Sequence, residues 1–287
     1  MKISEILNTD STTISLEVFP PKKWDNIGSV KQVVADMCTE FNPAFVSVTY
    51  GAGGMTPHFT MEVADCVKEM GQTPLFHLTC VTSTKEKIAS ILGDLRQHGI
   101  ENILALRGDI PEGFVFPDRQ HFTHANELVE IIRDYGGFCV GGACYPELHP
   151  DSKGVVDDLD NLKRKVDAGV DFLVSQLFLD NNKYYDFLER CAIRGINVPI
   201  EAGIMPITNA SLITKSIALS NATVPKKFYR LVERFGDNPK VMTEVGVIYA
   251  LNQIVDLIAN GVQHIHIYTM NKPYVTRKIV ESLNEIL

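Results

Sequence analysis

The stretch Thr13-Ile14-Ser15-Leu16-Glu17-Val18-Phe19 alternates polar and apolar side chains and runs into two prolines, Pro20 and Pro21. Such alternation predicts a β-strand with one apolar face, because successive side chains of a strand point to opposite sides. The prolines end the strand, since they cannot donate a backbone hydrogen bond to it. Seven further runs are typical of strands, and they cover 45–50, 75–80, 102–107, 138–144, 172–179, 199–205 and 264–269.

Longer amphipathic segments separate these runs and are typical of helices. They cover 30–40, 85–98, 126–135, 157–168, 184–193 and 278–286, with two extra helical segments, 226–235 and 242–259, before the last strand. Alternating strands and helices indicate βαβ units and a parallel sheet. Eight such units in 287 residues fit a closed barrel better than an open sheet. The predicted fold is a single-domain (β/α)8 TIM barrel over residues 1–287, with extra helices before the last strand.

The composition is that of an ordinary globular protein, with 45% hydrophobic and 22% charged residues. A net charge of −8 argues against nucleic acid or anionic lipid as a partner. The first residues do not resemble a secretory signal. The apolar segment 245–262 contains Asn252, Gln253 and Asp256, so we expect no membrane span. Six cysteines without a Cys-x-x-Cys pair are expected to be reduced, which favours a cytoplasmic location.

Polar side chains recur on one face of six predicted strands. The residues on this face are Ser15, Glu17, Ser47, Thr49, His77, Thr79, Ala105, Arg107, Asp109, Gln176, His266 and Tyr268. A purely apolar core would not repeat this pattern, because each buried polar group needs a partner. Many of these residues lie near the carboxyl ends of their strands, where barrel enzymes build their active sites. We therefore expect the site at that rim.

Two interpretations stay open for the charged residues of this rim. A carboxyl such as Glu17 in a partly dry barrel mouth should have a raised pKa and can act as a general acid. Alternatively, Glu17 forms a structural ion pair with Arg107. A turn at Gly108 lets Arg107 and Asp109 both project into the mouth, where they could serve a ligand or pair with each other.

The common nucleotide-binding and metal-binding patterns are absent from the sequence. The glycine cluster 51–54 permits either close approach to a ligand or a plain tight turn. Asn161, Arg164 and Lys165 share one helical face, which could grip a diphosphate or pair with the aspartates at 157, 158 and 160. The histidines do not share a metal-ligand spacing, so no metal is expected.

Seven motifs in order are specific in combination. They are 16–21 (LEVFPP), 46–54 (VSVTYGAGG), 77–80 (HLTC), 105–109 (ALRGD), 145–150 (YPELHP), 161–169 (NLKRKVDAG) and 268–272 (YTMNK). Over essentially its whole length the chain resembles bacterial methylenetetrahydrofolate reductase. The resemblance implies a flavoprotein of one-carbon metabolism and methionine biosynthesis that holds FAD on its barrel. It also implies reduction of 5,10-methylenetetrahydrofolate to 5-methyltetrahydrofolate by ping-pong hydride transfer.

The resemblance also implies roles for single residues. Glu17 resembles the general acid that opens the five-membered ring of the folate, and Asp109 the carboxylate that binds the pterin. Gln176, Lys272 and Thr49 match further substrate contacts. The positions that match FAD contacts are Thr49, Tyr50, Ala52, His77, Arg107, Gly108, Asp109, His124, Tyr145, His149, Asp158, Asn161, Arg164 and Lys165.

Three departures from the family pattern leave the electron donor open. Residues 55–59 stand where relatives usually have a polar stretch that contains an arginine. His124 stands where relatives commonly have a tyrosine, and Ser216 aligns roughly with an aromatic residue that, in relatives, helps to bind nicotinamide. The reductant is therefore NAD(P)H or a partner electron carrier, and we expect a homo-oligomer or a complex with a partner subunit.

The sequence allows two alternative functions. The chain could be a folate-binding barrel methyltransferase that acts with a corrinoid protein and without flavin. It could also be a non-catalytic barrel subunit, but a scaffold gains nothing from the polar residues Glu17, Asp109 and Gln176 in its core.

Overall fold

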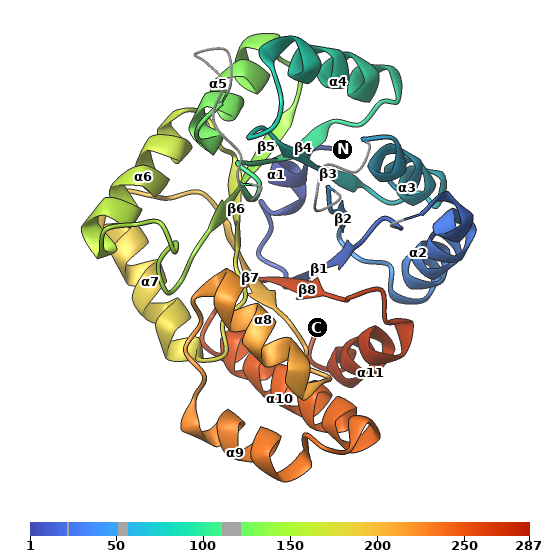
Figure 1. Ribbon diagram of the computed structural model, residues 1–287, viewed down its shortest axis with the longest axis vertical. Helices are drawn as coiled ribbons and strands as arrows, with labels where there is room; N and C mark the ends of the chain where they lie inside the picture. Colours follow the sequence, from blue (N-terminus) through green and yellow to red (C-terminus); the bar gives the residue numbers. More distant parts are fainter. Residues whose placement is uncertain (22, 51–56, 111–121) are drawn as a thin grey trace.

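The computed structural model describes residues 1–21, 23–50, 57–110 and 122–287, and its strands form a closed barrel (Figure 1). All neighbouring strands are parallel and follow chain order, and the pairing of the first with the last strand closes the barrel. This confirms the predicted TIM barrel. The strands are β1 (Thr13–Val18), β2 (Val46–Val48), β3 (Pro74–Thr79), β4 (Asn102–Leu106), β5 (Cys139–Cys144), β6 (Phe172–Ser175), β7 (Ile200–Ile204) and β8 (His264–Tyr268).

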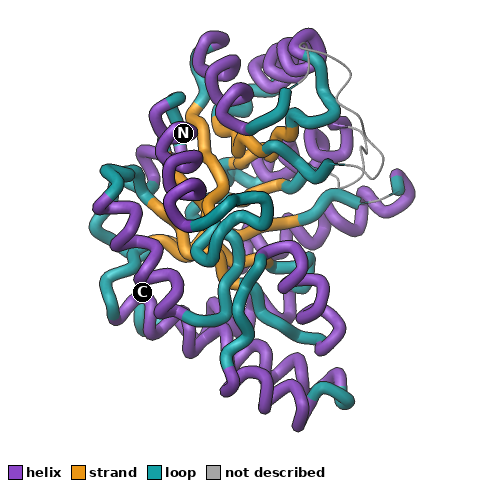
Figure 2. Tube along the Cα trace, turned by 60° about the vertical axis from the view of Figure 1, so that its left-hand side comes forward, coloured by secondary structure: helices purple, strands orange, loops and turns teal. Residues whose placement is uncertain are grey.

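The strands form the barrel at the centre of the molecule, and the helices surround it (Figure 2). Every predicted helix is present with shifted ends, and the structure also has the α-helices α1, α3 and α8 and the 3-10 helix η1, which the sequence analysis left unassigned. Between β7 and β8 the chain adds α9 and α10 to α8, which confirms the extra helices before the last strand. The helices are α1 (Ile3–Ile6), the short 3-10 helix η1 (Trp24–Asn26), α2 (Ile27–Phe41), α3 (Pro57–Glu69), α4 (Lys85–Gln97), α5 (Ala125–Tyr135), α6 (Val155–Asp167), α7 (Asn181–Ile193), α8 (Ala210–Ser220), α9 (Lys226–Phe235), α10 (Pro239–Ala259) and α11 (Pro273–Leu283).

Helix α10 is long and apolar enough to cross a membrane by length and composition. In the structure it packs against α7, α9, α11 and β7, and it buries side chains such as Met242, Ile254 and Leu257. Burial in the fold therefore accounts for part of its apolar composition, while Ile248 is 57% exposed. All six cysteines are also free and buried, as expected.

The amino end of the barrel is filled by apolar side chains. Ile3 and Leu7, from α1 and the residue after it, pack there with Phe45, Leu75 and Phe172. This cluster excludes water from one end of the barrel interior. A polar site inside the barrel can therefore open only toward the carboxyl ends of the strands.

The predicted orientation of β4 is wrong. The register pairs His77 with Leu104 and Leu78 with Ala105, and paired residues of parallel strands face the same side. Leu104 and Leu106 pack with the apolar cluster inside the barrel, whereas Ala105 packs with Leu78 toward the helices. The error arose because alternation alone gives two faces without saying which is inner.

Arg107 and Asp109 reach the rim by a turn and not by strand alternation. The backbone N–H of Cys80 contacts the carbonyls of both Leu106 and Arg107 at 3.2 Å, so the regular ladder ends here. Gly108 then adopts a φ of +85°, and a Cβ at this position would lie 3.0 Å from Thr79. A side chain is therefore disfavoured at Gly108 by both conformation and space.

The turn after β8 fixes the chain just beyond Glu17. The Thr269 hydroxyl donates to the Glu17 carbonyl at 2.6 Å, and the Asn271 side chain accepts from the Phe19 N–H and donates to the Phe19 carbonyl, both at 2.8 Å. Met270 and Asn271 have φ values of 52° and 53°, which are strained for residues with a Cβ. These contacts hold the end of β1 against the end of β8.

We expect Asn271→Ala to lower the free energy of unfolding by about 2–3 kcal/mol, because it removes two hydrogen bonds to Phe19 and keeps a Cβ in the left-handed region. Asn271→Gly loses the same bonds but relieves the backbone strain, so its loss should be smaller. Urea unfolding of both variants checks this. Equal stability of wild type and Asn271→Ala would contradict the assigned contacts.

Candidate active site

The Glu17 carboxyl lies inside the carboxyl end of the barrel. Glu17 is the last inward-facing residue of β1 and is 7% exposed. Its Oε2 lies 3.7 Å from Nε2 of His77 on β3 and 3.6 Å from Nε2 of His266 on β8. Arg107 instead pairs with Asp151 at 2.8 Å. Of the two interpretations of Glu17, the structure therefore does not support an ion pair with Arg107.

The contact between Glu17 and His77 is not an ion pair at neutral pH. Burial lowers the pKa of His77 to about 4, more strongly than the neighbouring Glu17 raises it. The imidazole is therefore neutral at pH 7, and the Ser47 hydroxyl contacts its Nε2. A neutral ring beside the carboxyl leaves Glu17 free of a permanent cationic partner.

A second carboxyl, Glu201, lies deeper in the same barrel. It is fully buried on β7, and its Oε1 accepts a 2.9 Å hydrogen bond from Ser15. The same hydroxyl lies 2.6 Å from Nδ1 of His266. Burial raises the pKa of Glu201 to about 7, although His266 and Ser15 act in the opposite direction. Sequence reasoning missed Glu201, and the signal was its place in a predicted strand that otherwise has no charged residue.

Tyr268 spans the barrel above this group. Its ring meets that of His266 edge to face, with centroids 5.2 Å apart, and its hydroxyl donates to the Ser175 carbonyl at 2.6 Å. Gly203 makes room for it, because a Cβ there would lie 2.8 Å from the tyrosine ring and 2.2 Å from the Ser175 carbonyl. Burial raises the pKa of Tyr268 well above its usual value, so the phenol stays neutral.

A second group of predicted residues gathers at the ends of β4, β5 and α6. The rings of Tyr145 and His149 meet edge to face at 4.7 Å, and the His149 N–H donates to Asp158 at 3.2 Å. The Lys165 ammonium contacts the Ala143 carbonyl, and burial lowers its pKa. Burial also lowers the pKa of His149, an effect that the nearby Arg107 reinforces.

The two groups belong to one rim. Burial raises the pKa of Tyr145, and the nearby Asp109 raises it further. A hydrogen bond from Tyr145 to the Gln176 side chain and the charge of Arg107 act in the opposite direction. Tyr268 in turn feels the charges of both Glu17 and Tyr145. Glu17 and Asp109 therefore open toward the same end of the barrel.

Other predicted residues lie outside these two groups or are described only in part. Thr49 and Tyr50 follow β2 and are partly buried. The Lys272 ammonium donates to the Thr208 hydroxyl at 2.7 Å, after β7. Ala52 lies outside the described residues, and the structure does not describe the side chain of Ser216.

Arg164 and Lys165 point in different directions. The Arg164 guanidinium is exposed and donates to Asn161 at 2.8 Å, whereas Lys165 points toward the end of β5. The structure therefore does not bring these two cations together. His124, whose side chain is 70% exposed, directly precedes α5 and contacts Thr123.

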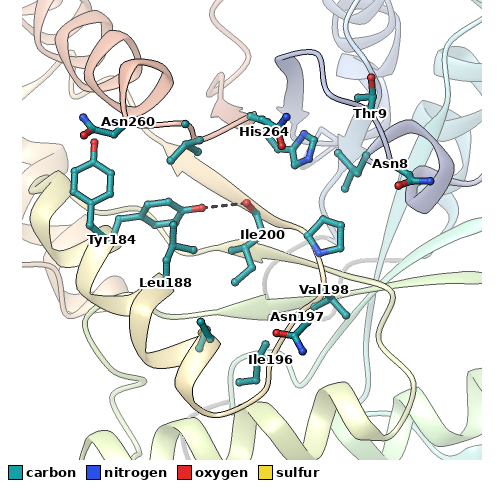
Figure 3. Close-up of a pocket in the computed structure, with 18 of the residues that line it drawn as sticks. Asn8, Thr9, Tyr184, Leu188, Ile196, Asn197, Val198, Ile200, Asn260 and His264 are labelled. Carbon is teal, nitrogen blue, oxygen red and sulfur yellow. Dashed lines mark hydrogen bonds between the residues drawn. The ribbon is translucent and has the colours of Figure 1, made fainter.

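A groove of about 640 Å³ lies at the opposite end of the barrel (Figure 3). It borders His264 and Ile200, the first residues of β8 and β7, and Asn260 after α10. Within it, the Tyr184 hydroxyl donates to the Ile200 carbonyl at 3.1 Å. Because Glu17 lies at the other end of its strand, this groove is separate from the rim.

The barrel and its rim define a (β/α)8 enzyme whose site combines a buried carboxyl–imidazole cluster with an adjoining group of cations. The sequence profile of the methylenetetrahydrofolate reductase family matches residues 2–284. The chain belongs to this family.

Relatives of known name span nearly the whole chain. The chain is 34% identical over 271 residues to the 5,10-methylenetetrahydrofolate reductase of Pectobacterium carotovorum subsp. carotovorum, covering 94% of this chain and 89% of that protein. It is 33% identical to the Escherichia coli (strain K12) enzyme of the same name, covering 94% and 90%. Methylenetetrahydrofolate reductase (NADH) 1 of Arabidopsis thaliana is 36% identical, but the match covers 48% of that longer protein.

Solved structures share the fold at low identity. An uncharacterized protein from Clostridium thermocellum, described as binding two copies of 5-methyl-5,6,7,8-tetrahydrofolic acid, superposes with a TM-score of 0.70 at 14% identity over both whole chains. A 2,3-dimethylmalate lyase gives a TM-score of 0.55 at 10% identity, covering 99% of this chain and 86% of that one. At these identities the likeness supports the barrel alone.

The pKa of Glu201, raised to about 7, predicts how stability depends on pH. Between pH 4.5 and 7 the folded protein keeps a proton that the unfolded chain releases, so Glu201 lowers stability as pH rises. Glu201→Gln removes this loss. The free energy of unfolding of the variant relative to wild type should therefore increase with pH, by about 3 kcal/mol across the window.

His77→Gln gives the opposite sign and serves as the control. The pKa of His77 is lowered to about 4, so the unfolded chain binds a proton that the folded protein does not. Wild type gains stability as pH rises from 4 to 6.5, and the variant lacks this gain. Urea unfolding of the three proteins between pH 4 and 7.5 measures both effects. A difference between Glu201→Gln and wild type that is constant with pH would refute the buried, protonated carboxyl.

Proposed function

We propose that this chain reduces 5,10-methylenetetrahydrofolate to 5-methyltetrahydrofolate by ping-pong hydride transfer through FAD. The observation that carries the proposal is the Glu17 carboxyl, which is buried beside a neutral imidazole and opens toward the same rim as Asp109. The named activity of the bacterial relatives supports it. We propose NAD(P)H or a partner electron carrier as reductant, and a homo-oligomer or partner-subunit complex as the assembly.

The residues of the second group fit the demands of FAD. When bound, this cofactor would accept and donate a hydride. Gly108 presents backbone without a Cβ, and Arg107 and Lys165 offer cations near the same strand ends, which suits a diphosphate. Tyr145 and His149 offer ring surfaces beside these cations. We propose that all positions matched to FAD contacts, including Ala52 and Arg164, take part in binding the cofactor.

Glu17 is proposed as the general acid. Its Oε2 would carry the proton that passes to a nitrogen of the folate and opens the five-membered ring to the reactive iminium. A carboxyl that lies beside a neutral imidazole, and not beside a permanent cation, suits this role. General acids of this kind contribute about 10²- to 10⁴-fold in rate.

Asp109 is proposed to bind the pterin ring, with further substrate contacts from Gln176, Lys272 and Thr49. The Gln176 side chain is hydrogen-bonded to Tyr145, and this bond fixes the Gln176 amide at the rim. A carboxylate at Asp109 would also disfavour negative charge on the reduced flavin and so make it a stronger hydride donor.

Spectroscopy of the purified protein tests the proposed function. We expect an oxidised-flavin spectrum that bleaches under anaerobic mixing with the physiological donor and returns on addition of 5,10-methylenetetrahydrofolate. Rapid bleaching by NADH alone would remove the need for a partner carrier. A colourless protein that binds folate and holds no flavin would contradict the proposal and favour the corrinoid-dependent methyltransferase.

Glu17→Gln separates the two half-reactions. It should leave flavin reduction within about twofold of wild type and slow oxidation of the reduced flavin by 5,10-methylenetetrahydrofolate by at least about 10²-fold, because only the second step needs the acid. Anaerobic stopped-flow spectroscopy measures both steps, and the reductive step is the internal control. Equal losses in both steps would exclude the assigned role.

A further inference from the structure

A buried chain of polar contacts continues from Glu17 into the barrel. Among the described residues, the buried side-chain atoms without a hydrogen-bond partner are Arg190 Nε, Glu201 Oε2 and His266 Nε2. The last two belong to one chain of contacts that ends at Glu17. Unpaired atoms of this kind are costly in a core, which points to a function for the chain of contacts beyond packing.

Two of its contacts are hydrogen bonds, and the third is a longer approach. Glu201 Oε1 lies 2.9 Å from Ser15 Oγ, Ser15 Oγ lies 2.6 Å from His266 Nδ1, and His266 Nε2 lies 3.6 Å from Glu17 Oε2. The four side chains come from β7, β1 and β8. Ser15, Glu201 and His266 are 0% exposed and Glu17 is 7% exposed, so solvent does not interrupt the series.

The series has two proton arrangements of equal proton number. In one, Glu201 holds a proton and donates to Ser15, Ser15 donates to His266 Nδ1, and the Nε2–H faces a Glu17 carboxylate. In the other, Ser15 donates to a Glu201 carboxylate, Nδ1–H donates to Ser15, and Nε2 accepts from a protonated Glu17. Two proton shifts along hydrogen bonds and a third across the 3.6 Å between His266 Nε2 and Glu17 Oε2 interconvert them, with no electron transfer and no charge gained or lost.

We propose that Glu201 is a positioning residue that shares one proton with Glu17 through Ser15 and His266, and so supplies the proton that the acid delivers. This rests on the proposed function of Glu17. Two carboxyls joined in this way lose their protons in two separate steps, because the first negative charge opposes the second. With Glu201 ionised, the second proton stays on the series and is available at Glu17.

The other titratable groups around the pair do not change charge in the relevant range. His77 faces Glu17 from β3 with its pKa lowered to about 4 by burial. Tyr268 on β8 and Tyr184 on α7 feel the charge of Glu201, and burial raises the pKa of each well above its usual value. His266 is the bridge itself. We therefore attribute a pH dependence of the site to the whole series of Glu17, His266, Ser15 and Glu201.

Glu201→Gln and Ser15→Ala break the sharing at different points. The rate of the oxidative half-reaction should fall with rising pH as the acid loses its proton. In both variants we expect this fall at lower pH, by at least about one pH unit, which is a tenfold change in proton affinity. Below the fall, the rate should stay within about threefold of wild type. The reductive half-reaction should not change.

Thr13→Val is the matched control. The Thr13 hydroxyl lies 2.9 Å from Nδ1 of His264. Like Ser15 and His266, these two residues pair a hydroxyl on β1 with an imidazole on β8, but they lie two residues nearer the amino ends of the strands. This variant should leave the pH profile in place. A uniform loss of rate in Glu201→Gln and Ser15→Ala, with no shift of the profile, would reduce the series to a structural role and overturn the proposal.

Infrared titration of protein labelled with ¹³C-glutamate tests the sharing without catalysis. Wild type should keep the carbonyl band of a protonated carboxyl through neutral pH, and Ser15→Ala should lose it at lower pH. Loss of the wild-type band at the pH of ordinary glutamates would refute the sharing, even if a variant fails to fold. A wild-type protein that shows the band but does not transfer hydride to folate would instead refute the proposed function alone.

Discussion

Closure of the barrel is the constraint on which the rest of the structure depends. Because β1 pairs with β8 as well as with β2, inward side chains from strands far apart in sequence meet in one narrow space. Ser15, Glu201 and His266 are brought within hydrogen-bond distance in this way. The apolar plug below them, formed by Phe45, Leu75 and neighbouring side chains, keeps water out and strengthens each of these polar interactions.

The two halves of the rim differ in solvation. Around Glu17 the side chains are buried, and its neighbours are the imidazoles of His77 and His266. Around Arg107 the groups are charged and partly exposed, and Arg107 is held by Asp151 on a loop. A dry half suits proton transfer, and a wetter, cationic half suits the binding of a phosphate-bearing ligand. The turn at Gly108 joins the two, since it carries Asp109 from the strand end onto the rim.

Sequence alone predicted the barrel because eight strand-like runs, all but the second followed by a predicted helix, leave few alternatives. It did not predict α1, which is one turn long, and it misassigned the inner face of β4, where leucines face inward against the apolar plug. Glu201 escaped notice because a single acidic residue in a strand gives no periodic signal. Its importance follows from Ser15 and His266, which only the closed barrel places beside it. The roles of the rim residues follow from the resemblance alone. The structure adds the contact between Tyr145 and the Gln176 side chain, which come from different strand ends.

The buried cluster also balances its own electrostatics. At about pH 6, His77 is neutral because its pKa is lowered to about 4, and Glu201 holds a proton because its pKa is raised to about 7. Neither group then adds a charge to the core. Between pH 4.5 and 6.5 their effects on stability have opposite signs and similar size. Together these two groups therefore add little net dependence of stability on pH in this window.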